Sequence, residues 1–245
     1  MTESNAREQG IEINRVNFVK FLELTNLRGA IENREAIINV TPDNITVNLA
    51  SVDKTCGLSG ILKGKFLDWG ILGLDDMSLL KKLVTTLTSD TINIKINKNK
   101  LILNDVTTKI SAILRDPQYI KNTVSGDKFK LIKEKAIGNE FSLSSDIITK
   151  IINNTAILNA SNLVIKGKDN KITFELESHE NKILSEFVVE ESITEFTLKL
   201  KNIFVDLLST FKENSIIVSA QDGCPIYVKT ESNNCQFEYV IAPLK

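Results

Sequence analysis

The chain has 245 residues, enough for one large core or for two domains of about 120 residues each. Its composition, 42% hydrophobic and 25% charged, is that of an ordinary globular protein. Lysine and arginine number 30 against 31 acidic residues, so the chain is not a strongly basic nucleic-acid binder, and any DNA-facing surface must come from local segregation of charge.

Several classes of function lack their sequence signals. No apolar run reaches the roughly 20 residues that span a bilayer, and the polar stretch after Met1 resembles neither a signal peptide nor an anchor, so we expect no membrane partner. The cysteines, Cys56, Cys224 and Cys235, lack the spacing of a zinc site or a disulfide framework. Phosphate-loop, nucleophile and zinc motifs are missing, and the single histidine, His179, lies in a charged stretch. We therefore expect a protein that is not an enzyme and uses no cofactor or metal.

The first half of the chain alternates short strands with two amphipathic helices. Expected strands span 11–13, 36–40, 45–49, glycine-punctuated segments over 58–74, and 92–96, and expected helices span 17–26 and 78–88. Asn17 is a candidate cap of the first helix, and Asp75 and Asp76 suit capping of the second better than metal binding. The turn chemistry of Pro42-Asp43-Asn44 predicts a hairpin between the second and third strands.

The second half repeats this arrangement. The apolar pattern of the second helix and of the strand after it recurs 124 residues later, with residue 79 matching residue 203. The helix residues Leu79, Leu80, Leu83, Val84 and Leu87 correspond to Ile203, Phe204, Leu207, Leu208 and Phe211, and the strand residues Ile92, Ile94 and Ile96 to Ile216, Val218 and Ala220. Ser144 would cap another helix, followed by strands near 162–166 and 171–176 around a turn at 167–170. Four helices, each followed by meandering strands, predict two similar domains.

The C-terminal end has the pattern of a hairpin that leads into an apolar tail. Two β-rich runs, 224–230 and 235–245, are separated by the polar turn-formers 231–234. Because Pro225 cannot donate to a ladder, its strand starts there or lies at an edge. The closing Ile241-Ala242-Pro243-Leu244 then leaves the sheet, and an exposed apolar tail favours a partner.

A linker is expected between the two halves. Arg115-Asp116-Pro117 ends the last strand of the first half, and the polar stretch that follows carries scattered apolar residues among lysines. This mixture is typical of a segment that crosses a surface. We expect an N-terminal domain over 1–116 with residues 1–10 disordered, a linker over 117–140 and a C-terminal domain over 141–245.

These features resemble the DNA sliding clamps of the proliferating-cell-nuclear-antigen type and their phage counterparts. The likeness is carried by the closing strand Tyr239-Val240-Ile241-Ala242-Pro243, the proline-led strand before it, the stretch 47–53 and the linker. It covers nearly the whole chain from about Ile11, by arrangement more than by identity. The resemblance implies the DNA clamp fold, an α+β fold of two similar clamp domains, each with helices on one face of antiparallel sheets. It also implies a ring of three subunits with the helices lining the hole.

The resemblance implies a processivity factor that encircles double-stranded DNA independently of sequence, tethers a DNA polymerase and is opened by an ATP-dependent clamp loader. The expected DNA-binding residues on the helix faces are Lys20, Arg28, Lys81, Lys82, Lys150 and Lys212, with Asp206 making this lining less basic than expected. The expected partner-peptide pocket comprises Val52, Cys56, Tyr119, Ile120, Pro225, Ile241, Ala242 and Pro243. The expected interface of the homotrimer pairs the edge strands near 107–114 and 182–189 through Ile110, Ile113, Ile183 and Phe187.

Two other functions are compatible with the same residues. One is a clamp-fold protein that does not close a ring, such as a viral processivity or transcription accessory factor acting as a monomer. The other is a β-rich structural or assembly protein, in which the polar helix faces are merely solvated. Subunit count separates the first from a clamp, and retention on DNA separates the second. The expected location is the cytoplasm or nucleoid of a host cell for a phage protein, and the nucleus for a eukaryotic one.

Overall fold

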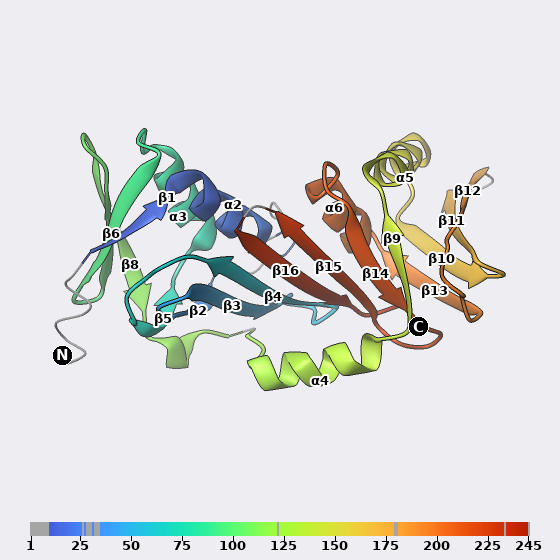
Figure 1. Ribbon diagram of the computed structural model, residues 1–245, viewed down its shortest axis with the longest axis horizontal. Coiled ribbons are helices and arrows are strands. Elements are labelled where there is room, and N and C mark those ends of the chain that lie inside the picture. Colours follow the sequence, from blue (N-terminus) through green and yellow to red (C-terminus); the bar gives the residue numbers. More distant parts are fainter. Residues whose placement is uncertain are drawn as a thin grey trace. The chain divides into compact units, whose positions relative to one another are not determined.

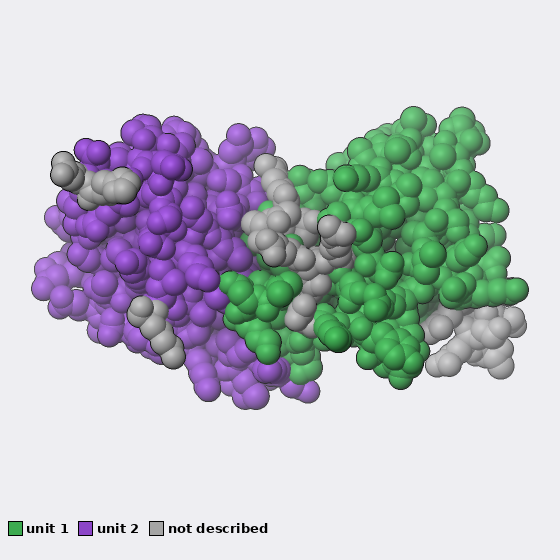
Figure 2. Space-filling view, turned by 180° about the vertical axis from the view of Figure 1, so that it is seen from behind, with its two compact units in different colours: residues 1–54, 58–126, 232–237 green, residues 55–57, 127–231, 238–245 purple. Residues whose placement is uncertain are grey.

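The computed structural model describes residues 10–25, 27, 31, 35–121, 123–178, 181–232 and 234–244. The chain divides into two compact units (Figure 2). Unit 1 comprises residues 1–54, 58–126 and 232–237, and unit 2 comprises residues 55–57, 127–231 and 238–245.

Unit 1 combines antiparallel strands with two neighbouring helices (Figure 1). Its elements are β1 (Ile11–Asn14), α2 (Arg15–Thr25), β2 (Ala36–Val40), β3 (Asn44–Ala50), β4 (Cys56–Lys63), β5 (Gly70–Leu74), α3 (Met77–Thr85), β6 (Thr91–Asn97), β7 (Lys100–Asn104) and β8 (Lys109–Arg115). The strands are hydrogen-bonded in the order β1-β6-β7-β8-β5-β2-β3-β4. A short 3-10 helix, η2 (Pro117–Tyr119), follows β8.

Unit 2 begins with a helix in the linker and then repeats the order of unit 1. Its elements are α4 (Gly126–Ala136), β9 (Asn139–Leu143), α5 (Ser145–Leu158), β10 (Asn162–Lys168), β11 (Lys171–Ser178), β12 (Asn181–Val188), β13 (Phe196–Lys201), α6 (Ile203–Thr210), β14 (Ile216–Ala220), β15 (Ile226–Ser232) and β16 (Cys235–Ile241). Strands β16-β15-β14-β9 are neighbours in that order, and β12-β11-β10-β13 form a separate four-stranded sheet.

The duplication that the sequence predicts is confirmed by the topology. In the described part of the chain, each unit runs strand, helix, four strands, helix, three strands. The pairing is also equivalent, because β1-β6-β7-β8 has its counterpart in β9-β14-β15-β16, and β4-β3-β2-β5 in β12-β11-β10-β13. The fold is therefore α+β with two similar domains.

The helix starts follow local capping chemistry. The side chain of Asp76 accepts a hydrogen bond of 2.8 Å from the backbone of Leu79, and Ser144 accepts one from Ile147, as the sequence predicts. The prediction that Asn17 caps the first helix is wrong. The side chain of Asn14 is the acceptor, at 3.0 Å from the backbone nitrogen of Asn17, so the helix begins two residues earlier than expected.

The predicted hairpins are present. The backbone of Thr41 donates to Asn44 across the turn between β2 and β3. Between β10 and β11, Asp169 and Asn170 have positive φ angles of 50° and 57°, a conformation that Asn and Asp tolerate better than most residues. β15 begins at Ile226, directly after the proline that the sequence places at its start.

Each unit has its own aromatic core. In unit 1, Phe21 of α2 lies 5.9 Å from Phe237, measured between ring centroids, and both side chains are buried. In unit 2, Phe211 after α6 meets Tyr239 edge to face at 5.8 Å. Because such side chains contribute large buried areas, the first pair holds α2 against β16 in unit 1, and the second holds the end of α6 against β16 in unit 2.

Candidate functional site: helix faces, strand edges and the C-terminal tail

Helices α2 and α3 of unit 1 carry three of the expected DNA-binding residues. Lys20 lies on α2 and is partly exposed, while Lys81 and Lys82 lie on α3. Lys82 is exposed, but Lys81 forms an ion pair of 3.6 Å with Glu23 on α2. Arg28 lies outside the described residues. The two neighbouring lysines of α3 therefore differ in how much charge they offer to a ligand.

Unit 2 presents its lysines on the corresponding helices. Lys150 is an exposed residue of α5, and Lys212 is exposed just beyond the end of α6. Among the described residues, neither forms an ion pair within 4.0 Å. Asp206 is exposed on α6, and partial burial of its carboxyl group raises its pKa. Asp146 is a second exposed acid on α5, so these two lysines of unit 2 are matched by two acids on the same helices.

The expected interface strand β8 presents an open edge in unit 1. Only Leu114 and Arg115 at its C-terminal end pair with β5, whereas Lys109 to Ile113 pair with β7 alone among the described residues. Ile113 is 62% exposed, but Ile110 is buried inside its own unit, where it cannot contact a neighbouring subunit directly. A cavity of about 190 Å³ lies between β8 and α3, and its lining combines the exposed Leu79 and Ile113 with two acids, Asp75 and Asp76.

The second expected interface strand, β12, is the outermost strand of the four-stranded sheet. Ile183 and Phe187 are only half-exposed, and Phe187 stacks on Phe174 of the same unit at 5.7 Å between ring centroids. The exposed apolar residues of this strand are instead Leu184 and Val188, at 57% and 73% exposure. Sequence reasoning missed these two, although strict alternation along the strand places them on the opposite face.

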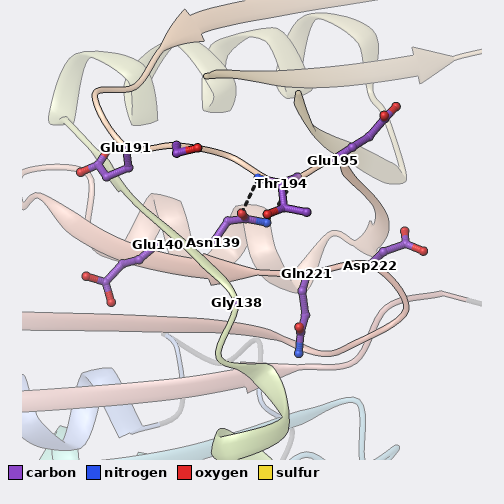
Figure 3. Close-up of a pocket in the computed structure, with 9 residues that line it drawn as sticks. Gly138, Asn139, Glu140, Glu191, Thr194, Glu195, Gln221 and Asp222 are labelled. Atoms are coloured by element: carbon purple, nitrogen blue, oxygen red, sulfur yellow. Dashed lines mark hydrogen bonds between the residues drawn. The ribbon is translucent and has the colours of Figure 1, made fainter. Parts of the chain in front are cut away.

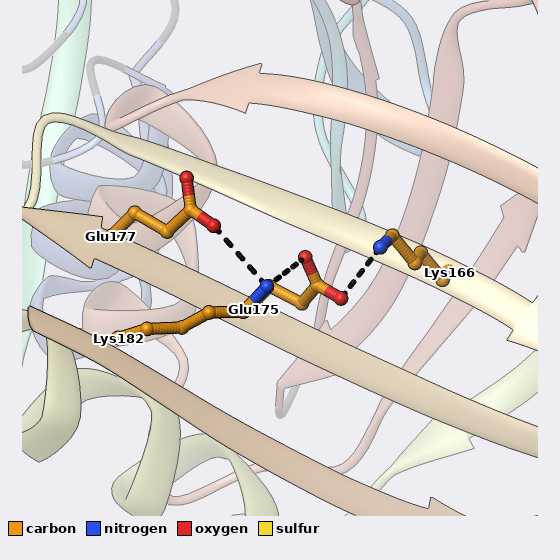
Figure 4. A network of polar contacts seen from close by, with 4 residues as sticks. All are labelled: Lys166, Glu175, Glu177 and Lys182. Carbon is orange, nitrogen blue, oxygen red and sulfur yellow. Dashed lines mark hydrogen bonds and ion pairs between the residues drawn. The ribbon is translucent and has the colours of Figure 1, made fainter.

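The outer face of that sheet carries a network of four charged residues (Figure 4). Glu175 accepts hydrogen bonds from Lys166 at 2.6 Å and from Lys182 at 3.1 Å, and Lys182 also pairs with Glu177. Burial opposes ionisation of Glu175, but the two lysines outweigh it and lower the pKa of that carboxyl. These cross-strand pairs join β10, β11 and β12, so they support the edge strand.

The residues expected to form a partner pocket are distributed over both units. Val52 and Tyr119 are exposed in unit 1, while Ile120 is buried there beside Gly73. In unit 2, the remaining residues surround the end of β16: Cys56 and Ile241 are buried, and Pro225, Ala242 and Pro243 are partly exposed.

The C-terminal tail is fixed by backbone hydrogen bonds within unit 2. Ala242 donates to the carbonyl of Thr55 at 2.8 Å, and Leu244 donates to the carbonyl of Lys199 at 2.7 Å. The partly exposed apolar tail thus has a defined position beside Thr55 and β13, which matches the expectation that it leaves the sheet after Ile241.

The linker contains a helix that the sequence analysis did not predict. In α4, Phe129 and Ala136 are buried, and the partly exposed Lys133 forms an ion pair of 2.6 Å with Glu238 of β16. The signal was present, because Phe129, Ile132, Lys133 and Ala136 follow the i, i+3, i+4, i+7 pattern of one helical face.

A cavity of about 590 Å³ in unit 2 is lined by polar and acidic residues (Figure 3). Asn139 lies at its centre, accepting from the backbone of Thr194 at 2.7 Å and donating to the carbonyls of Thr194 and Ala220. Its carboxylates belong to Glu140, Glu191, Glu195 and Asp222. This concentration of negative charge would repel a phosphate backbone, so the cavity is no candidate for binding DNA.

Metal sites and membrane-spanning helices are both absent from the described residues. No group of three or more His, Cys, Asp or Glu side chains is arranged to hold a metal ion. In the same part of the chain, no helix combines the length and the apolar character required to cross a membrane.

Comparison of the sequence with family models gave no match, and none of the curated proteins matches it. The fold, in contrast, is shared with solved structures. Proliferating cell nuclear antigen from Entamoeba histolytica has a TM-score of 0.76 and 13% identity, with 96% of this chain and 98% of that chain covered. The A. fulgidus PCNA bound to the C-terminal region of FEN-1 has a TM-score of 0.80 and 11% identity, over 96% and 98% of the two chains. PCNA from Thermococcus kodakaraensis has a TM-score of 0.76 and 12% identity, over 96% and 99%. The chain therefore has the fold of the PCNA-type sliding clamps over nearly its whole length.

Proposed function

We propose that the protein is a DNA sliding clamp, a processivity factor that closes into a homotrimeric ring around duplex DNA and tethers a DNA polymerase. The observation that carries the proposal is the duplicated unit with two helices, matched over 96% of the chain by solved clamps. A ring of three chains would contain six copies of this unit. The protein itself would catalyse no reaction, and an ATP-dependent loader would open the ring.

Closure of the ring is supported by two edges of different units. The open part of β8 and the outermost strand β12 both carry exposed apolar residues, among them Ile113 and Val188. An exposed edge with apolar side chains is a template for pairing, and natural proteins protect it or use it. Pairing of β8 in one subunit with β12 in the next is head-to-tail, and such a contact closes a ring when the rotation allows it.

DNA would be held by lysines repeated three times around the hole. Lys82, Lys150 and Lys212 are exposed on or beside the helices. The few lysines of one chain would be repeated three times in the trimer and together would surround the hole. Contacts of this kind go to phosphates and carry no sequence information. The protein would act wherever its DNA is replicated, in the cytoplasm or in a nucleus.

Polymerase and loader would bind at the end of β16. The tail residues Ala242 and Pro243 are partly exposed beside the buried Ile241, an arrangement that suits a short peptide with one or two apolar anchors. The A. fulgidus PCNA that shares this fold was solved with a bound segment of FEN-1, which supports peptide binding as the mode of partner capture.

Mass in solution tests the assembly. At tens of micromolar, sedimentation should give a particle of about three times the 27.3 kDa of one chain. A protein that stays monomeric under these conditions would instead fit an accessory factor that does not form a ring.

A further inference from the structure

Helix α4 is attached to unit 2 by an aromatic residue. Phe129 is 4% exposed, and its ring lies close to Gly57. A methyl group added at Gly57 would lie 3.7 Å from the ring and 4.0 Å from the carbonyl oxygen of Val240. The ring therefore lies beside Gly57, and an added methyl group would touch it at an ordinary van der Waals distance.

A basic residue one turn later makes the second attachment. The amino group of Lys133 lies 2.6 Å from the carboxylate of Glu238 and 5.1 Å from the ring centroid of Tyr227. The hydroxyl of Tyr227 donates to the same carboxylate oxygen at 2.8 Å. Burial and this hydrogen bond raise the pKa of Tyr227, so the phenol remains a donor at neutral pH.

Two further contacts hold the C-terminal end of α4: Ala136 is buried, and the side chain of Gln221 donates to the carbonyl of Lys135 at 2.9 Å. Leu131 is 60% exposed, and the residues around it are mostly lysines. A helix of this length is marginal in water by itself, because nucleation costs more than a few turns return. Helix α4 therefore depends on its contacts with the rest of unit 2, in which Phe129 and Lys133 provide the aromatic and the charged contact.

We propose that Gly57, Tyr227, Glu238 and Val240 form a binding surface for short helical segments that carry an aromatic residue and, four positions later, a basic residue. Helix α4 is the internal occupant of this surface. Partner segments of the same chemistry bind by displacing it, and the linker thereby lowers their apparent affinity.

The competition rests on the proposed function, because Cys56 and Ile241, the neighbours of Gly57 and Val240 in the chain, belong to the proposed partner pocket. For a partner that must displace α4, the apparent affinity equals the intrinsic affinity multiplied by the fraction of molecules in which the surface is open. The linker thereby sets a minimum intrinsic affinity that a partner segment needs in order to bind.

Hydrogen exchange tests whether α4 detaches separately. In the wild type, the amides of α4 should exchange at least about 10-fold faster than those of β16, because local openings cost less than global unfolding. Phe129→Ala should increase the exchange rate of the α4 amides by a further factor of about 10 and leave the exchange rate of the β16 amides unchanged. Leu131→Ala, a truncation on the exposed face of the same helix, is the matched control and should change both rates little. Equal exchange of α4 and β16 in the wild type would overturn the proposal.

A peptide added in trans tests whether the surface accepts a ligand. The probe is a fluorescent peptide with the sequence of residues 124–138, added to the full-length chain. It should bind the Phe129→Ala chain about 10-fold more tightly than the wild type, in which the surface is occupied. The same peptide carrying Phe129→Ala should bind neither chain. Equal binding of the intact peptide to both chains, or binding to neither at millimolar concentration, would overturn the proposal.

Neither measurement involves DNA, a polymerase or a second subunit. If α4 detaches and the peptide binds while the protein fails to be retained on DNA, the clamp function falls and the binding surface stands. If α4 and β16 exchange together while DNA retention succeeds, the binding surface is contradicted and the clamp function stands.

Discussion

The amino group of Lys81 lies 3.6 Å from the carboxylate of Glu23, and this ion pair joins α3 to α2 on the face proposed to meet DNA. The two side chains are 32% and 22% exposed, so the pair contributes at most about 1 kcal/mol to stability. Its larger effect is electrostatic. Part of the positive charge of Lys81 is neutralised within the chain, whereas Lys82 beside it forms no ion pair among the described residues.

Removing the acid of this pair should strengthen DNA binding. Glu23→Gln releases Lys81 for contact with a phosphate. In a trimer, one extra contact per subunit would make the slope of log K against log salt concentration steeper by up to about 3. Binding to a short duplex over a series of salt concentrations measures this slope. Glu134→Gln, which removes an exposed acid from α4, should leave it unchanged.

The two lysines of α3 should not be equivalent. Lys82→Gln is expected to weaken DNA binding more than Lys81→Gln. The reason is that the charge of Lys81 is already partly neutralised by Glu23, whereas that of Lys82 is not. Both variants should sediment as trimers, so the comparison separates DNA contact from assembly. An equal loss in the two variants would show that the ion pair with Glu23 has no influence on DNA binding.

The proposed ring should depend on the exposed residues of the two edge strands. Ile113→Asp or Val188→Asp places a charge in the buried contact between β8 and β12 and should dissociate the trimer at micromolar concentration. The control is Val106→Asp, at a 92% exposed position between β7 and β8. Sedimentation should give monomers for the first two variants and trimers for the control, all with unchanged folding.

The pH dependence of stability should include a contribution from Glu175. Its pKa in the folded protein lies below the ordinary glutamate pKa of 4.5, so the stabilisation is fully present above that pH and is lost as the pH falls through the folded pKa. Glu175→Gln should lower the free energy of unfolding at pH 7 by about 1.5–3 kcal/mol, since hydrogen bonds to a charged group are lost. The difference from wild type should shrink as the pH falls through the lowered pKa of Glu175. Glu177→Gln, at a 62% exposed side chain, should cost much less.

Removal of the C-terminal tail should separate partner binding from assembly. Deleting residues 242–245 removes the backbone hydrogen bonds to Thr55 and Lys199, which should cost about 1–3 kcal/mol of stability, and it also removes one wall of the proposed pocket. The truncated chain should still form trimers but no longer tether the polymerase. Polymerase binding that survives the truncation unchanged would place the pocket elsewhere.

Much of the fold could be predicted because its signals are local or periodic. Asp76 is one residue before an apolar helical pattern, and Pro42-Asp43-Asn44 forms a turn wherever it stands, so both were found. The pattern shared between residues 79 and 203 also agrees in burial, because Leu80 and Val84 are buried like their counterparts Phe204 and Leu208. The helix cap at Asn14 was missed because Asn14 and Asn17, three residues apart, are both residues that suit a cap.

The orientation of edge residues was harder to predict. Ile110 and Ile113 are three residues apart, so a regular strand directs them to opposite faces, and only Ile113 is available to another chain. Ile183 and Phe187 share a face, but that face is the one occupied by the core of their own unit, as the stacking of Phe187 on Phe174 shows. Which face of an edge strand is buried depends on the helices packed on it. Helix α4 was missed because its apolar positions are few and lie among lysines.

Retention on DNA of different topology tests the central proposal most directly. Loaded onto nicked circular DNA, the protein should resist a salt challenge that removes free protein, because phosphate contacts are screened while encirclement is not. Linearising the circle should release it from the ends at the same salt concentration. Equal retention on circular and linear DNA, or loss from both at the same salt concentration, would contradict the sliding clamp.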